Sequence, residues 1–271
     1  AGVNASMFSA RNKPALREKY GYRDEQQIVI YTGSLDKFQR IDYLLDATHL
    51  LKPQYPELKV ILASNIANQK DLDTIEAQIQ ALDIDDVVDI VKGLELEKLP
   101  DYLALSDVAT LPRTDCPGHP VKILNYMCGN IPIAGFTGAA KGLHHMKTAV
   151  LAEDHNVEEF AKSIAMLLDE KDKAQYVAAQ ARQTLGELYE WKVLAKGIAV
   201  IYDMLIERDF ETRKPLLKQY IRDSYQPKFW DKRQARTTPV PADILERRKG
   251  ERRKHHLRID FIERRRVIDA E

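Results

Sequence analysis

Short apolar runs alternate with amphipathic helical stretches over the first 206 residues of the chain. The first run, Ile28-Val-Ile-Tyr-Thr32, is rich in β-branched residues and lacks polar alternation, which is typical of a strand buried on both faces. The same reasoning predicts strands at 28–32, 58–63, 87–91, 107–111, 131–134 and 149–152. Helical periodicity predicts helices at 41–51, 71–82, 96–105, 120–128, 156–169, 172–186 and 191–206.

Strands that alternate with helices indicate βαβ units, which are joined by right-handed crossovers into a parallel sheet. The fold class expected is therefore α/β, a doubly wound (Rossmann-like) sheet in a single domain over residues 1–206. The three trailing helices would cover the faces of that sheet. No internal repeat is visible inside this domain.

The pattern decays after Ile206. Four prolines punctuate the charged stretch that follows, and they are Pro215, Pro227, Pro239 and Pro241. We expect a flexible linker with one helix at 213–223, then a basic tail in which Glu-Arg-Arg recurs from positions 246, 251 and 263. Residues 207–271 thus form a charged C-terminal extension that buries too little apolar surface to fold alone.

Charge separates the two segments. Residues 207–271 hold 19 of the 41 basic and 12 of the 41 acidic residues, a net charge of +7, which leaves −7 for residues 1–206. No run approaches the roughly 18 consecutive apolar residues that cross a bilayer. The chain begins at Ala1 rather than Met, which suggests a fragment or a processed chain. Its two cysteines, Cys116 and Cys128, make no disulfide framework, so a reducing, cytoplasmic location is the simplest expectation.

Glycine and basic residues gather in the loops after the first and fourth predicted strands. In the commonest doubly wound order these two strands flank the point where strand order reverses, and ligands bind there beyond the carboxyl ends of the strands. The loops are Gly33-Ser34-Leu-Asp-Lys37-Phe-Gln-Arg40 and Pro112-Arg-Thr-Asp-Cys-Pro-Gly118-His119. Glycine beside cations is what a phosphate cradle requires, so this pair of loops predicts a phosphate site.

The second loop runs into a helix that Pro120 suits as its first residue. Lys122 in the first turn opposes the helix dipole, and an anion bound there would reverse that penalty. Lys122 and Asn125 share one face, and we expect Val121, Leu124 and Cys128 to form the apolar one. A solvated lysine on an ordinary helix explains Lys122 equally well.

Most basic loop residues are merely solvated, which is the plainer interpretation of Lys37 and Arg40. Their place beside Gly33 at the end of the first strand favours a binding role. Neither a G-x-G-x-x-G fingerprint nor a P-loop motif occurs, which argues against a dinucleotide-binding protein and a P-loop NTPase.

No metal site is expected. Asp83-Ile-Asp85 precedes its strand and so lies at the wrong edge of the sheet, where a solvated turn is the better interpretation. The pairs His144-His145 and His255-His256 have no further ligands around them in the sequence.

Several of these segments resemble the C-terminal, donor-binding domain of retaining GT-B-fold glycosyltransferases of family 4 (group 1). The stretch "PRTDCPGHPVKILNYMCGNIPIAG" (112–135) looks like the family's donor-binding segment, and "IVIYTGSLDKFQRIDYLLDA" (28–47) resembles its first strand, glycine loop and helix. The likeness extends to "LEKLPDYLALSDVATLPR" (96–113), to the opening "AGVNASMFSA" and to the helix that begins at Trp191.

The resemblance implies a site. Gly33, Ser34, Arg40, Gly118, His119, Lys122 and Asn125 would contact the donor diphosphate, sugar and ribose. Arg40, or less favourably Lys37, would supply the charge that the family often takes from an arginine after the glycine, because Ser34 stands there. The family's pair of glutamates corresponds to Pro117 and Asn125, so neither carboxylate is present, although Asn125 can still hydrogen-bond a ribose hydroxyl.

The resemblance also implies a reaction and partners. The whole protein would transfer a sugar from a nucleotide diphosphate sugar with retention, without a cofactor or a required metal, and this chain would be its donor half. The acceptor domain, which precedes this domain in the family, would be its partner. No catalytic residue is expected in this half, whose role would be electrostatic stabilisation of the departing diphosphate.

Two other interpretations stay open. Without the glutamates, the domain could be a non-catalytic nucleotide-sugar-binding or scaffold module. The tail could dock on a membrane surface or another polyanion, or it could be a solvated charge run. Nucleic-acid binding is not expected, because few aromatic residues interleave with the tail's arginines.

Overall fold

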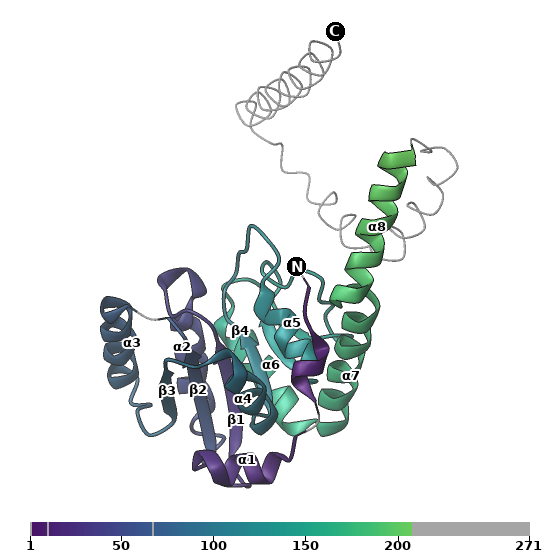
Figure 1. The fold of residues 1–271 in the computed structure, drawn as a ribbon. Coiled ribbons are helices and arrows are strands. Elements are labelled where there is room, and N and C mark those ends of the chain that lie inside the picture. Colours follow the sequence, from purple (N-terminus) through teal and green to yellow (C-terminus); the bar gives the residue numbers. More distant parts are fainter. Residues whose placement is uncertain (1, 10, 67, 208–271) are drawn as a thin grey trace, which may run out of the picture. The chain divides into compact units, whose positions relative to one another are not determined.

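The computed structural model describes residues 2–9, 11–66 and 68–207, which belong to one compact unit, Ala1–Leu217. Six strands form one sheet in the order β3-β2-β1-β4-β5-β6, and every neighbouring pair is parallel (Figure 1). The strands are β1 (Gln27–Thr32), β2 (Leu58–Ser64), β3 (Val88–Lys92), β4 (Val108–Leu111), β5 (Ile133–Phe136) and β6 (Val150–Ala152). All six predicted strands and the doubly wound α/β class are confirmed.

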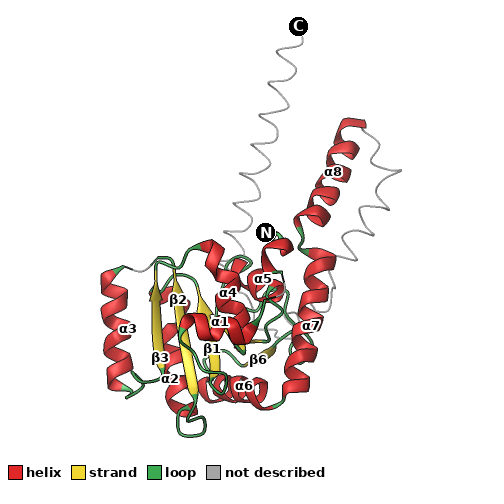
Figure 2. Ribbon diagram, turned by 60° about the horizontal axis from the view of Figure 1, so that its bottom comes forward, coloured by secondary structure: helices red, strands yellow, loops and turns green. Residues whose placement is uncertain are grey.

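Helices cover both faces of this sheet (Figure 2). One core cluster packs α2 (Ile41–Leu51), α3 (Gln69–Ala81) and α6 (Val157–Asp169) against the sheet. A second cluster joins α4 (Leu99–Leu105) and α5 (Val121–Cys128) to the opposite face, and α7 (Lys171–Leu188) contributes to both. With both faces covered, the side chains of β1 from Ile28 to Thr32 are all buried, as its unalternating apolar run predicted.

The helices differ from the predicted set in two places. The predicted helix 96–105 is split into a 3-10 turn, Leu96–Lys98, and α4. The helix α1 (Lys13–Tyr20) was not predicted, although Asn12 caps it by accepting a hydrogen bond from the Ala15 N–H and Gly21 ends it at φ +80°. The helix α8 (Trp191–Glu207) matches its prediction, and the helix expected at 213–223 lies outside the described residues.

A buried ion pair fixes α1 to the start of the sheet. The guanidinium of Arg17, only 3% exposed, donates to the Leu105 and Asp24 carbonyls and to Asp107, whose Oδ2 lies 2.8 Å from Nη2. The same Oδ2 accepts a hydrogen bond from the Ile28 N–H at 2.7 Å. One carboxylate therefore connects α1 to the first residues of β1.

None of the helices among the described residues is long and apolar enough to span a bilayer.

Candidate functional site

The loops after β1 and β4 meet, because β1 and β4 are neighbours in the sheet. Gly33 ends β1 with φ +128°, a backbone conformation that L side chains rarely adopt. A Cβ built on Gly33 would lie 2.9 Å from the Nζ of Lys122 on α5. The predicted convergence of the glycine loop and the lysine-bearing helix is therefore confirmed.

Tyr126 positions α5 over the two strands. Its hydroxyl accepts hydrogen bonds from the N–H and the hydroxyl of Thr32 on β1 and donates to the Thr110 carbonyl on β4. Lys122 precedes Tyr126 by one helical turn and so lies on the same face. The predicted apolar face is wrong at Val121, which is 56% exposed, because Ile123, Tyr126 and Met127 fill the core with Leu124 and Cys128.

The ammonium of Lys122 contacts neutral groups. It donates to the Tyr31 hydroxyl at 2.7 Å and to Gln39 Oε1 at 2.9 Å, and Tyr31 in turn donates to the Ser34 carbonyl. Lys122 takes part in none of the ion pairs among residues 2–9, 11–66 and 68–207. Burial and, to a smaller extent, the nearby Arg113 guanidinium lower the pKa of Lys122 to about 7.

Arg113 is a site residue that the sequence reasoning missed. It is 7% exposed, its guanidinium lies 4.7 Å from the centre of the Phe38 ring, and its Nε has no hydrogen-bond partner within the described part of the chain. It makes no ion pair there either. A buried, unpartnered guanidinium is costly, so this position favours a bound anion. Its position just after the fourth strand was the sequence signal that could have identified Arg113 as a site residue.

Arg40 lies in the predicted loop, but its charge is already paired. Its Nη2 is 2.7 Å from Asp42 Oδ2, its Nε contacts the same carboxylate, and its guanidinium stacks 3.6 Å from the centre of the Tyr43 ring. It adopts φ +55° just before α2 begins. Lys37 is exposed in the same loop. The strongest uncompensated positive charge in this region therefore comes from Lys122 and Arg113.

Ser34 and the 112–119 loop supply the polar surroundings. The Ser34 hydroxyl donates to Asp36 at 2.6 Å and accepts from Gln39. Gly118 is exposed with open space where a Cβ would stand. His119 packs its ring 5.2 Å from that of Tyr189; its two buried ring nitrogens find no partner among the described residues, and burial lowers its pKa.

The start of α5 leaves backbone donors open. Pro120 precedes the helix, and no side chain caps it. The Ile123 N–H donates to the Pro120 carbonyl at 3.1 Å, which leaves the N–H groups of Val121 and Lys122 as the donors that, with the helix dipole, favour an anion. Asn125 lies one turn further along, half-buried. The chemistry available is therefore anion binding by backbone donors and two cations.

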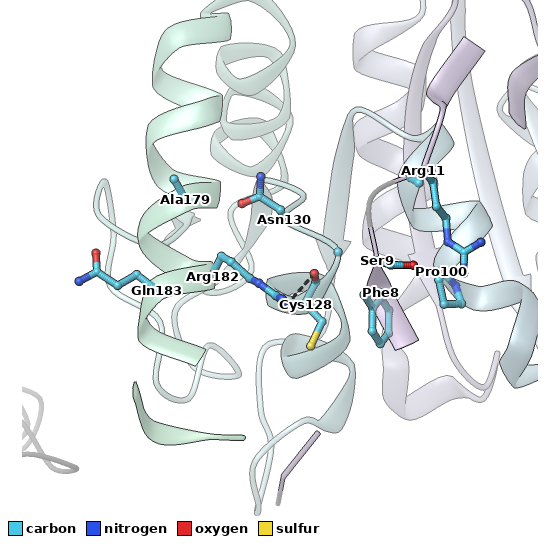
Figure 3. Close-up of a pocket in the computed structure, with 11 residues that line it drawn as sticks. Phe8, Ser9, Arg11, Pro100, Cys128, Asn130, Ala179, Arg182 and Gln183 are labelled. Atoms are coloured by element: carbon cyan, nitrogen blue, oxygen red, sulfur yellow. Dashed lines mark hydrogen bonds between the residues drawn. The ribbon is translucent and has the colours of Figure 1, made fainter. Parts of the chain in front are cut away.

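A cavity of about 660 Å³ lies elsewhere, at the C-terminal end of α5 (Figure 3). Its walls come from Phe8, Ser9, Arg11, α4, the end of α5 with the two residues that follow it, and α7. Its two arginines are already engaged: Arg11 pairs with Asp101 at 2.6 Å, and Arg182 donates to the Cys128 carbonyl at 2.9 Å. With both arginines engaged, size alone does not make this cavity the functional site.

The described residues contain no cluster of three His, Cys, Asp or Glu side chains suited to a metal ion. Asp83 and Asp85 lie in the turn before β3, where the Asp83 side chain is 95% exposed. His145 accepts a hydrogen bond from the Leu151 N–H, while His255 and His256 lie outside the described residues.

Comparison with known proteins places this geometry in context. The family model "Glycosyl transferases group 1" matches residues 12–184, more than half of the chain. A D-inositol 3-phosphate glycosyltransferase of Thermobispora bispora is 24% identical over 221 residues, which cover 78% of this chain and 51% of the relative. The chain thus spans about half the length of this curated relative.

Solved structures share the fold. Anabaena HepE in complex with UDP aligns with a TM-score of 0.68 at 18% identity, over 74% of this chain and 56% of that one. The C-terminal domain of a group 1 family protein, LpcC of Francisella tularensis, aligns with a TM-score of 0.62 at 16% identity, over 70% of this chain and 100% of that one.

Proposed function

The chain belongs to the group 1 glycosyl transferases, and from that membership we propose that it is the donor-binding half of an enzyme that transfers a sugar from a nucleotide diphosphate sugar with retention. One observation carries the proposal. Lys122 lies beside Gly33 in the first turn of α5, Arg113 is close enough to act on its charge, and neither has a carboxylate ion pair among the described residues. Two such cations suit a diphosphate, which is also part of the UDP bound by Anabaena HepE.

Each proposed contact follows from placement. Because Gly33 has no side chain, the diphosphate can approach Lys122 past Gly33 and Ser34, and Lys122 with Arg113 neutralises it. Arg40 contributes only if the donor draws it away from Asp42.

The sugar and ribose contacts lie further along the second loop. The N–H groups around Gly118 and His119 hydrogen-bond the sugar, and Asn125 hydrogen-bonds a ribose hydroxyl. The nucleotide sugar is a substrate, and we propose neither a cofactor nor a required metal. The catalytic contribution of this half is stabilisation of charge on the departing diphosphate.

The acceptor belongs to another part of the whole protein. The chain covers 51% of the inositol-phosphate glycosyltransferase it matches. In the GT-B enzymes that the sequence resembles, the acceptor binds a second Rossmann-like domain. We therefore propose no general base in this chain.

A second candidate function is a nucleotide-sugar-binding module without transferase activity. The observation that favours it is the presence of Pro117 and Asn125 where the resembling family has glutamates. A transfer assay on the full-length protein with a radiolabelled donor separates the two, since sugar transfer or donor hydrolysis refutes the module.

The tail supports a separate proposal, contact with the cytoplasmic face of a membrane. Its net charge of +7 is the motive, because each basic residue near an anionic surface contributes roughly 1 kcal/mol before screening. Truncation after Ile206 should abolish salt-sensitive co-sedimentation with phosphatidylserine vesicles. Absent or unchanged vesicle binding would overturn this contact.

Calorimetric titration with UDP, GDP and ADP tests the donor site. We expect heat with at least one nucleotide, and Lys122→Met should weaken that binding by about 1.5–3 kcal/mol, as for a hydrogen bond to a charged group. Lys162→Met is the matched control, because Lys162 is an exposed lysine on α6. If the folded chain binds none of the three, the donor site is refuted.

A further inference from the structure

Lys122 lies in surroundings that disfavour its charge. Its ammonium has two neutral acceptors, the Tyr31 hydroxyl and Gln39 Oε1, and the buried guanidinium of Arg113 is its main charged neighbour. Asp36 offers some compensation, but its carboxylate already accepts hydrogen bonds from the Ser34 hydroxyl and the Phe38 N–H. In the unliganded chain the proton on Lys122 is therefore weakly held.

The tyrosines and the arginine packed around Lys122 keep one state near neutral pH. On β1, burial raises the pKa of Tyr31 well above its ordinary value, and within α5 burial raises that of Tyr126 to about 12, so both stay neutral. The second loop contributes the Cys116 thiol and Arg113, which is always charged. Of the groups named here, Lys122 is the one to which we assign a change in charge between pH 6 and 8.5.

We propose that Lys122 takes up a proton from solvent as the donor diphosphate binds, so that the affinity for nucleotide sugar falls as the pH rises. This inference rests on the proposed function. The diphosphate lies between Lys122 and Arg113, and its negative charge offsets the repulsion of the guanidinium. Burial, and to a smaller extent the Arg113 guanidinium, hold Lys122 partly deprotonated until the anion arrives.

The size of the effect follows from the pKa of about 7 for Lys122 in the unliganded chain. Below that pH the lysine is charged before binding and the affinity is constant. Above it the dissociation constant rises about tenfold per pH unit, reaching about 30-fold at pH 8.5. At pH 8 about 0.9 proton should enter per donor bound.

The experiment is calorimetric titration of the full chain with UDP-glucose and GDP-mannose from pH 6 to 8.5. Their diphosphates are diesters that do not titrate in this range, whereas the terminal phosphate of UDP or GDP does. Repeating the titration at pH 8 in HEPES and in Tris, which differ in ionisation enthalpy and contain no phosphate to compete for the site, counts the protons. We expect uptake near one proton and the predicted loss of affinity.

Variants separate this mechanism from a structural role. Lys122→Arg should bind without pH dependence or proton uptake, because a guanidinium stays charged. Arg113→Met should move the midpoint to higher pH, and Lys162→Met should leave it unchanged. If the affinity for the nucleotide sugars does not change between pH 6 and 8.5, the inference about Lys122 is wrong, but the proposed function stands. If neither nucleotide sugar binds at any pH, both the inference and the proposed function are wrong.

Discussion

Gly33→Ala is the sharpest test of how the glycine loop serves Lys122. The added Cβ would stand 2.9 Å from Lys122 Nζ, 3.2 Å from its Cε and 3.4 Å from the Tyr31 hydroxyl. The lysine is flexible and can swing away, but it then leaves the place where the diphosphate is proposed to bind. The backbone is affected as well, because φ at Gly33 is +128°.

Two terms set the loss of stability. A non-glycine residue held in such a backbone conformation costs about 1–3 kcal/mol. Displacing Lys122 breaks its hydrogen bonds to Tyr31 and Gln39, each with a net contribution of about 0.5–1.5 kcal/mol. We therefore expect a free energy of unfolding lower by about 2–6 kcal/mol, and donor binding weaker by about 1.5–3 kcal/mol from the lost charge-assisted contact.

Gly93→Ala is the matched control. Gly93 follows β3 with φ +70°, and a Cβ there meets nothing within 4 Å. In urea unfolding, Gly93→Ala should lower the free energy of unfolding only by the about 1–3 kcal/mol that its backbone conformation costs. In calorimetry it should bind nucleotide with unchanged affinity. If Gly33→Ala, still folded, binds nucleotide as tightly as the unmodified chain, then Lys122 does not act from this position and the site is misassigned.

Three further substitutions test the framework of the domain. Asp107→Asn should lower the free energy of unfolding by about 3–5 kcal/mol, because it leaves the buried guanidinium of Arg17 unpaired. Burial alone would raise the pKa of Asp107, but Lys13, the Ile28 N–H and Arg17 outweigh it and hold that pKa low. The stabilisation that Asp107 provides is therefore complete above about pH 3.8 and is lost as its carboxylate is protonated at lower pH. Asp107→Asn should lack this contribution to the pH dependence of unfolding. Gly138→Ala should destabilise the chain in thermal melting, since its Cβ would stand 1.9 Å from the Thr114 carbonyl oxygen, whereas Gly186→Ala, with open space in α7, should gain about 0.5–1 kcal/mol.

The sheet could be predicted because its signals are local. The apolar runs mark the strands, and the commonest doubly wound order then brings β1 beside β4, which placed Gly33 and Lys122 together before any coordinates. The helix α1 has equally local signals in Asn12 and Pro14, but it is polar on most of its surface and was missed. Val121 was misassigned because helical spacing alone does not say where an apolar stripe begins.

The identity of the cations was harder to predict, because it depends on pairing rather than position. Arg40 and Arg113 both follow a strand and a glycine or proline, so the sequence does not distinguish them. What separates them is that Asp42 lies within reach of Arg40, while Arg113 is buried against Phe38 without a carboxylate. Such partnerships arise from side-chain packing, which no periodicity encodes.

The missing glutamates and the unpaired cations form one electrostatic argument. Where the resembling family carries two carboxylates, this chain has Pro117 and Asn125, and Asn125 shares a helix face with Lys122. A glutamate at 125 would offer Lys122 a counter-charge one turn away and hold its proton without any ligand. With asparagine there, neutralisation of Lys122 and Arg113 falls to the bound molecule. A site arranged in this way gains most from a ligand with two negative charges, which is the charge of a nucleotide sugar's diphosphate.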